Sequence, residues 1–546
     1  MSVKLITPSS KIHNWIITTF IFTSLCIASF SLHDLVQSLG FSVFFESLFF
    51  QYDFPASLVF LFVLSIAFFC IDRRGRMGRA FEKVSRHSSW LAMGVLLITA
   101  LGSWFVYHTH PLSMDEYAPS FQSEIFASGH LVGNVPIKFL DTFVFKGFQG
   151  SFLEVSHTSG AVASAYWPGL AVVMTPFTLL GVSWLCNPVL SYLTILLLAR
   201  LLNEVVVSPA AKGYALLATA FSPAIVFNGM SFYGMPLQLL CCIGFTLGMI
   251  RGTPRYLLFA GFSGAMSMVA VNPFPFFLYA LPWVYWFFLQ ENRSAKSFFW
   301  VILGGLPIVL VLGIGWKFLV AQTFQDEVAL NSGATLSVFS LPSYRTVIMR
   351  GIGLAKLWLW AVPGLMSLAF LAYFFKANSR WVKVFMQAGL LSLIGYLFVV
   401  FDQGHGWGYR YFHTAWLVLP VLAAVAFEAL ERDVNGHQQL YGFAMATCIG
   451  TAILLLPYKA TQVEAFVAKS LDQVPARVEG NSRQLVFLRL TCHAMTDMVQ
   501  NTPYFNGNEL RLVSGGTKLD TQIALSLGTR PRIVENFPCA QRWVLD

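Results

Sequence analysis

The sequence predicts an all-α polytopic membrane protein of about thirteen transmembrane helices, followed by a small extracytoplasmic α/β domain at the C-terminus. Of its 546 residues, 56% are hydrophobic and only 11% are charged, whereas a soluble globular domain has roughly 25% charged residues. Apolar runs long enough to cross a bilayer recur up to about residue 457, and the chain is polar beyond that point. These observations exclude a soluble globular protein.

The apolar runs place the expected spans along the chain. A membrane helix needs about 20 mostly apolar residues. The runs lie near residues 13–32, 56–71, 89–107, 187–203, 212–229, 233–250, 256–271, 274–290, 299–320, 356–376, 382–401, 411–430 and 438–456. The first run lacks a clear cleavage site and is therefore expected to be a membrane helix rather than a signal peptide.

Basic residues in short loops predict the orientation. The net charge is +9, and six Lys and Arg residues crowd the loop 72–86. Because such loops face the cytoplasm, we expect a cytoplasmic N-terminus. Segments 108–186, 321–355 and 402–410 and the C-terminal tail then share the opposite side. The apolar run 168–185 is expected to be a short embedded or surface helix, because a full crossing would invert every later loop.

The polar tail predicts a separate small domain. Short strands are expected at 484–490, 509–513 and 532–536, with a helix at 517–527. Two cysteines, Cys492 and Cys539, lie in this tail, and they could pair in an oxidising compartment, although their spacing alone does not show it. The expected organisation is therefore an N-terminal pair of helices with a basic loop (1–88), a transmembrane module (89–457) with an outer loop (108–186), and an extracytoplasmic domain (458–546).

Two adjacent carboxylates, Asp115 and Glu116, lie a few residues past the end of the span 89–107. In a sheltered cleft near a membrane surface, a carboxylate can act as a general base towards a hydroxyl or an amine. The alternative is a solvated acidic helix N-terminus, which is common and favourable.

A helix is expected directly after the acid pair. Pro119 fits its first turn and Gly129 its end. Three apolar residues of this segment share one face, so the helix is expected to lie on the membrane surface. It would fix the position of the two carboxylates at its N-terminal end.

The turn 401–413 is the second candidate site. It holds Asp402, His405, Arg410 and His413 among three glycines and several aromatic residues. A guanidinium group presents a planar fork of donors that suits phosphate oxygens, and glycines let a backbone approach a ligand closely. The alternative is an interfacial aromatic turn with an arginine that reaches towards water.

The spans themselves carry few ionisable residues. Transporters of ions or protons usually hold such residues near the middle of the membrane. The sequence has no Walker loop and no HExxH motif, and no metal-binding spacing among its eight cysteines. Chemistry at the membrane surface is therefore favoured over conduction, and the sequence assigns no metal site and no resident cofactor.

Four motifs in order resemble the membrane-embedded glycosyltransferases of the GT-C superfamily, which include the protein O-mannosyltransferases and the aminoarabinose transferase of lipid A. The resemblance covers roughly residues 89–457. Its motifs are Met-Asp-Glu-Tyr (114–117), Tyr-Trp-Pro-Gly (166–169), the Phe-Ser-Pro turn that runs from 221 to 236, and Gly-Trp-Gly-Tyr-Arg-Tyr (406–411).

The resemblance implies transfer of a sugar from a polyprenyl-phosphate carrier, the donor co-substrate, to a lipid, glycan or protein acceptor outside the cytoplasm. It implies that Asp115 is the general base and that Glu116 assists it. Arg410 would bind the donor phosphate with His405 and Tyr409. The remaining residues expected around the cleft and the acceptor are Tyr166, Tyr117 and His157.

Two other functions stay open. An O-antigen ligase or polymerase would also use a lipid-linked glycan, with Arg and His in outer loops rather than an early acid pair. A lipid or glycan transporter would form no new glycosidic bond. In each case we expect an integral membrane protein, in a bacterial inner membrane for the glycosyltransferase, with membrane lipids as partners and no nucleic acid.

Overall fold

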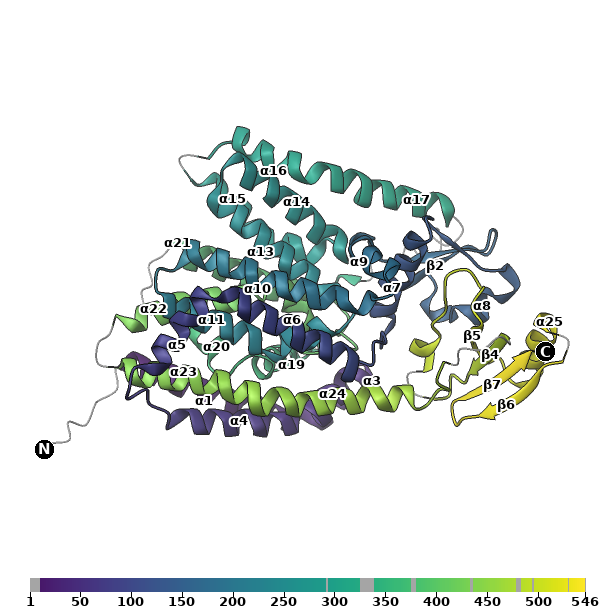
Figure 1. Ribbon diagram of the computed structural model, residues 1–546, viewed down its shortest axis with the longest axis horizontal. Helices are drawn as coiled ribbons and strands as arrows, with labels where there is room; N and C mark the ends of the chain where they lie inside the picture. Colours follow the sequence, from purple (N-terminus) through teal and green to yellow (C-terminus); the bar gives the residue numbers. More distant parts are fainter. Residues whose placement is uncertain are drawn as a thin grey trace, which may run out of the picture.

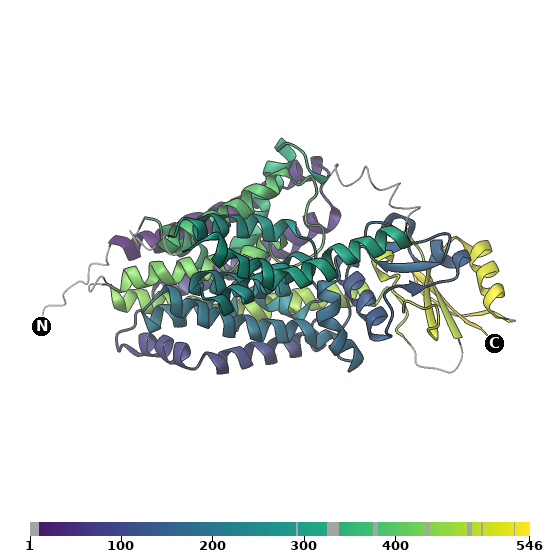
Figure 2. The ribbon, with the colours of Figure 1, turned by 90° about the horizontal axis from the view of Figure 1, so that it is seen from above.

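The computed structural model describes residues 10–290, 293–324, 338–374, 380–432, 436–477, 483–492, 495–528 and 530–545. Most helices run along the long axis of the molecule, and the strands of the C-terminal segment, within residues 483–545, gather at one end of it (Figures 1 and 2). Of the expected outer loop 321–355, residues 325–337 lie outside this description.

Helices occupy every range in which the sequence predicts a span. The helices before the outer loop are α1 (Ser10–Ala28), α2 (His33–Ser38), α3 (Val43–Ser47), α4 (Phe54–Phe68), α5 (Arg76–Arg86) and α6 (Ser88–Phe105). The later helices of the membrane module are α10 (Cys186–Val205), α11 (Pro209–Phe221), α12 (Pro223–Met230), α13 (Met235–Arg251), α14 (Pro254–Ala270), α15 (Phe274–Phe288), α16 (Ala295–Ile308), α17 (Trp316–Thr323), α19 (Tyr344–Leu359), α20 (Leu365–Leu371), α21 (Arg380–Gly395), α22 (Val418–Glu431), α23 (His437–Gly450) and α24 (Leu456–Leu471).

The predicted number of about thirteen spans is not confirmed. Within the described residues, seven helices are long and apolar enough to cross a membrane, or eight if the bent pair α11 and α12 forms one span. Proline accounts for several of the shorter pieces, because it removes a helical hydrogen bond. Pro223 follows a 48° bend between α11 and α12, and Pro363 lies in the break between α19 and α20. The apolar helices nevertheless show an integral membrane protein.

The segment between α6 and α10 corresponds to the predicted outer loop. It contains α7 (Met114–Ala127), the three-stranded sheet β1-β3-β2, the short helix α8 (Leu140–Phe143) and α9. The strands are β1 (Gly133–Asn134), β2 (Leu153–Val155) and β3 (Ala161–Ser164), and all pairs are antiparallel. The run 168–185 yields α9 (Gly169–Leu179), which has 11 residues and is too short to cross a membrane.

Two expectations about α7 differ from the structure. Pro119 was expected in the first turn, but the helix begins at Met114 and places Pro119 in the second turn. The helix is also buried around most of its circumference, including polar residues such as Gln122 and Ser123. It packs between α9 and the C-terminal domain rather than presenting a single apolar face.

The C-terminal domain is built on a four-stranded sheet of order β5-β4-β7-β6. Its elements are β4 (Arg483–Leu488), β5 (Glu509–Val513), α25 (Thr517–Leu527), β6 (Arg532–Asn536) and β7 (Ala540–Leu545). The three predicted strands and the helix are confirmed, whereas β7 was not anticipated. Cys492 and Cys539 form a disulfide.

The outer loop and the C-terminal domain share one hydrophobic core. Tyr117 and Phe121 of α7 belong to the same buried cluster as Leu485, Leu510 and Trp543 of the sheet. Phe139 stacks on Phe505 with ring centroids 4.8 Å apart. Segments separated by more than three hundred residues therefore fold together at this end of the molecule (Figure 1).

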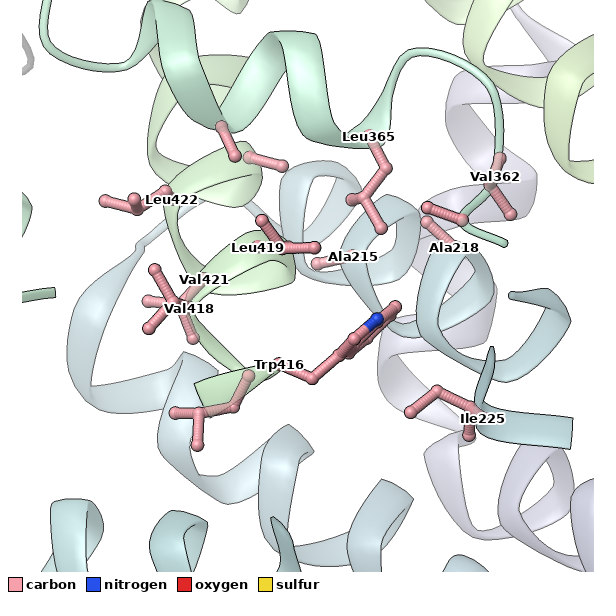
Figure 3. Close-up of a cluster of buried hydrophobic side chains, with 14 of the residues drawn as sticks. Ala215, Ala218, Ile225, Val362, Leu365, Trp416, Val418, Leu419, Val421 and Leu422 are labelled. Carbon is pink, nitrogen blue, oxygen red and sulfur yellow. The ribbon is translucent and has the colours of Figure 1, made fainter. Parts of the chain in front are cut away.

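A second core lies inside the helical module. Trp416, just before α22, is buried among side chains of α11, α12 and α22, which include Ala215, Ile225 and Leu419 (Figure 3). This packing fixes the start of α22, and thereby the end of the turn 401–413 that precedes it.

Buried charges join the N-terminal helices to the rest of the module. Asp53 accepts from Lys356 of α19 at 2.8 Å and from Lys459 of α24 at 3.1 Å. Trp360 donates to the same carboxylate at 2.6 Å. All three charged side chains are almost fully buried. Removal of one partner would leave an uncompensated charge in an apolar interior, which is strongly unfavourable.

Glycines allow α14 and α16 to pack backbone to backbone. A Cβ atom at Gly261 would lie 1.9 Å from the carbonyl oxygen of Val301, and one at Gly304 would lie 2.1 Å from that of Leu258. Neither backbone can give way without separating the two helices, so small residues are required at this crossing.

We expect the substitution Gly261→Ala to lower the thermal unfolding midpoint in detergent, with a cost of about 1–3 kcal/mol from overpacking. Gly351→Ala is the matched control, because a Cβ atom there meets open space and alanine favours a helix over glycine. Equal midpoints for the two variants would contradict this account of the helix crossing.

Candidate active site

Asp115, the predicted general base, lies in the first turn of α7. His108 and Thr109 adopt left-handed φ values of 51° and 53° and turn the chain back after α6. The carboxylate Oδ2 accepts from Nη1 of Arg410 at 2.8 Å, and Oδ1 accepts from the hydroxyl of Tyr166. Sequence motifs far apart in the chain thus meet at one carboxylate.

The surroundings of Asp115 keep it ionised. Burial raises the pKa of this carboxyl group, but the charge of Arg410 and the hydrogen bonds from Tyr166 and Arg410 outweigh burial and lower its pKa below the usual range. Its side chain remains 25% exposed, so a substrate can reach it.

Glycines shape the turn that carries Arg410. Gly406 has a φ of +121°, a value that favours glycine, and a Cβ atom there would lie 2.3 Å from Cδ of Arg410. Arg410 donates from Nη1 to the carbonyl oxygens of Gln403 at 3.1 Å and His405 at 2.7 Å. The guanidinium lies over the ring of Tyr233, 4.2 Å from its centroid. The buried Nε has no hydrogen-bond partner within the described part of the chain.

The other two residues predicted to bind the donor phosphate, His405 and Tyr409, do not line the pocket around Asp115. Nδ1 of His405 lies 3.0 Å from the hydroxyl of Tyr233, and burial lowers the pKa of His405 to about 3, which keeps its ring neutral. Tyr409 is buried against Gly353 of α19 and does not line the pocket around Asp115. His405 therefore supports the pocket wall through Tyr233.

Glu116 points away from the pocket. Its carboxylate is fully buried and accepts from the backbone N–H groups of Leu112 at 2.9 Å and Phe232 at 3.1 Å. Burial outweighs these bonds and raises its pKa to about 7. Glu116 thus ties α7 to the 231–234 turn.

The two remaining predicted residues are not brought to this pocket. The hydroxyl of Tyr117 donates to the carbonyl oxygen of Asn501 at 2.5 Å and faces the C-terminal domain. His157 lies in the turn between β2 and β3, where its Nε2 is 3.1 Å from Oε1 of Gln149.

Several pocket residues were not found by sequence reasoning. Tyr233, Gln238, Asn272 and Thr414 line the pocket with Asp115. Single neutral polar residues at helix ends form no recognisable sequence motif. They come together in one pocket only because of the way in which α13, α14 and α15 pack. The Ser-Pro turn ending at Pro236 was the available signal for Tyr233.

The C-terminal domain holds the start of α7. The N-cap residue Ser113 makes no capping bond and instead contacts the hydroxyl of Tyr233 at 3.1 Å. Oδ1 of Asp497 accepts from the backbone N–H of Met114 at 2.9 Å. Gln500 donates to the carbonyl oxygen of Pro111 at 2.8 Å. A residue 383 positions away thus supplies the cap of the helix that carries Asp115.

An apolar groove of about 650 Å³ lies between α14, α15 and α16. Phe274 and Phe276 line this groove, whereas Pro275, between them, lines the pocket around Asp115. The first turn of α15 therefore separates a polar pocket from an apolar groove. No group of His, Cys, Asp or Glu side chains that could hold a metal ion exists among the residues described.

No protein-family model and no curated protein matches this chain. Among solved structures, ArnT from Cupriavidus metallidurans bound to undecaprenyl phosphate is similar, with a TM-score of 0.51 and 12% sequence identity over 84% of this chain and 98% of that chain. The apo structure of the same protein has a TM-score of 0.49 and 13% identity over 83% and 97%. The undecaprenyl-phosphate-bound structure shows that this chain has the GT-C fold, which confirms the resemblance found in the sequence.

The raised pKa of Glu116 predicts a pH-dependent stability. Because burial raises the pKa from 4.5 to about 7, the folded state favours the protonated form. This contribution is complete below about pH 4.5 and is lost as the pH rises through 7. The stability of the wild type minus that of Glu116→Gln should therefore fall between pH 5 and 8, by on the order of 3 kcal/mol. Thermal unfolding measured across this range is the test, and a constant difference would contradict it.

The cap supplied by Asp497 predicts local protection of α7. Loss of a helix cap costs about 0.5–2 kcal/mol, so Asp497→Ala should speed amide hydrogen exchange in α7 by about 2- to 30-fold. Asp497→Asn keeps an acceptor oxygen and should exchange nearly as the wild type does.

Asp520→Ala is the matched control for this experiment. Asp520 is buried in the same domain and accepts from Ser514 and Gly515 beside α25. Its loss should speed exchange in α25 and leave α7 protected. Faster exchange in α7 for both alanine variants would mean that general loosening of the domain, rather than the cap, protects α7.

Proposed function

We propose that this protein is a glycosyltransferase that moves a sugar from a polyprenyl-phosphate carrier to a hydroxyl group of a lipid, glycan or protein at the extracytoplasmic face. The observation that carries the proposal is the contact between Asp115 and Arg410, which sets a carboxylate base beside a phosphate-binding cation in a partly exposed pocket. The fold shared with ArnT, whose structure holds undecaprenyl phosphate, supports it.

Arg410 is suited to the donor phosphate. Its side chain is 14% exposed, and its hydrogen bonds to Asp115, Gln403 and His405 all leave from Nη1. None of these bonds uses Nη2, which can donate to a phosphate oxygen in charge-assisted geometry. Such a contact stabilises the negative charge that grows on the leaving phosphate.

Asp115 is suited to act as the base. It takes the proton of the acceptor hydroxyl while that oxygen attacks the anomeric carbon. The bond between this carbon and the phosphate oxygen breaks, and the lipid phosphate leaves with the bonding electrons. Donor phosphate that engages Arg410 also weakens the interaction that lowers the pKa of Asp115. Donor binding therefore makes Asp115 a stronger base.

The apolar groove between α14, α15 and α16 is suited to the polyprenyl tail. Its lining is almost entirely hydrophobic, so burial of an isoprenoid chain there is favourable. The groove and the pocket lie on either side of the first turn of α15. A carrier can therefore place its tail in the groove and its phosphate near Arg410.

The substitution Asp115→Asn keeps the size of the side chain and removes the base. We expect the rate of sugar transfer in reconstituted membranes to fall by about 10²- to 10⁴-fold, with binding of undecaprenyl phosphate retained.

Arg410→Lys should instead weaken binding of undecaprenyl phosphate, because lysine lacks the guanidinium fork. Mass spectrometry of lipids and glycans detects the transferred sugar.

Other outcomes would support the competing functions. Transfer abolished by Arg410→Ala but intact in Asp115→Asn would favour a ligase or polymerase that does not use an early acid. Movement of a lipid or glycan across liposomes without a new glycosidic bond would favour a transporter.

A further inference from the structure

We infer that the donor sugar is a neutral monosaccharide, recognised through its hydroxyl groups by Gln238, Asn272 and Thr414. The inference rests on the proposed function and names its substrate class. These three side chains come from the first turn of α13, the turn between α14 and α15, and the helical turn after Arg410.

The pocket has no charge available for a charged sugar. Of its described lining residues, only Asp115 and Arg410 are charged, and they pair with each other at 2.8 Å. When a donor phosphate engages Arg410, Asp115 is needed for the acceptor hydroxyl. An ammonium or carboxylate on the sugar would then lose its water without gaining an opposite charge, which is unfavourable.

Amide and hydroxyl side chains form a polar wall on one side of the pocket. Gln238 and Thr414 are 2% and 3% exposed. Thr414 donates to Oε1 of Gln238 at 3.1 Å, and Nε2 of Gln238 lies 3.3 Å and 3.4 Å from the carbonyl oxygens of Ser267 and Asn272. The amide is thus held in place, and Oε1 retains a lone pair. Sugar hydroxyls both donate and accept, so they match this wall of amides and hydroxyls.

Two tyrosines complete the wall without adding a charge. Tyr396 and Tyr411 stack with centroids 4.3 Å apart and an interplanar angle of 10°, and Arg350 lies over the ring of Tyr411, 4.8 Å from its centroid. The hydroxyl of Tyr411 donates to the carbonyl oxygen of Asp402 at 2.8 Å, which fixes the ring. Both faces of Tyr411 are thus occupied, and the pair forms a fixed, uncharged part of the pocket wall.

The size of the pocket disfavours a large donor. Its cavity volume is about 80 Å³, which corresponds to roughly three water molecules at their volume in the liquid. A cavity of this size has no room for a preassembled oligosaccharide.

The test measures binding of four synthetic donors to the full-length protein in lipid nanodiscs. These are undecaprenyl-phosphate conjugates of a neutral hexose, a neutral pentose, an amino sugar and a uronic acid, with undecaprenyl phosphate alone as reference. We expect at least one neutral donor to bind at least tenfold more tightly than either charged donor. A charged donor that binds as tightly as the best neutral donor overturns the inference.

Variants of Gln238 and Thr414 test whether these side chains cause the preference for neutral donors. Gln238→Glu supplies a carboxylate and should improve binding of the amino-sugar donor relative to the neutral donors by at least tenfold. Thr414→Val should weaken the neutral donors about tenfold and leave undecaprenyl phosphate alone unaffected. The matched control is Thr175→Val on α9, whose hydroxyl bonds only within its own helix. An unchanged preference in Gln238→Glu would overturn the assignment.

Binding of undecaprenyl phosphate alone distinguishes failure of the neutral-sugar inference from failure of the proposed function. If undecaprenyl phosphate binds and the donors bind irrespective of charge, the neutral-sugar inference fails while the proposed function stands. If neither undecaprenyl phosphate nor any donor binds, both are overturned.

Discussion

The contact between Asp115 and Arg410 joins residues 295 positions apart, and the surrounding structure holds both side chains in place. On one side, Glu116 and Asp497 fix the first turn of α7 through backbone N–H groups. On the other side, Arg350 donates to three carbonyl oxygens of the segment 396–401 that leads into the turn. A paired charge needs this precision, because a buried ion pair is favourable only with good geometry and further hydrogen bonds.

The N-terminal helices, which the family resemblance does not cover, contribute to the same turn. Ser42 donates to the carboxylate of Asp402 from its backbone at 2.8 Å and from its hydroxyl at 2.7 Å. Arg345 donates to the carbonyl oxygens of Leu39 and Gly40. The buried ion pair between Asp53 and Lys356 also attaches the N-terminal segment to α19. The described part of this segment, residues 10–88, therefore braces the arginine side of the site.

The C-terminal domain braces the other side. It closes a common core over α7 and supplies the cap that Ser113 does not provide. Since Ser113 instead contacts Tyr233, which also contacts His405, the cap and the pocket wall are linked through neighbouring side chains. The C-terminal domain is thus part of the architecture around the candidate site.

The sequence by itself determined the membrane class, the place of nearly every helix and the GT-C resemblance, because hydrophobic length and local motifs are properties of contiguous residues. It also singled out Asp115, Tyr166 and Arg410, whose residue types are distinctive. It did not separate complete spans from broken ones, and it did not anticipate Gln238 or the cap from Asp497. Those depend on contacts between residues far apart in the chain, and only the tertiary packing decided which polar side chains share a pocket and which, as with Glu116, serve to hold it.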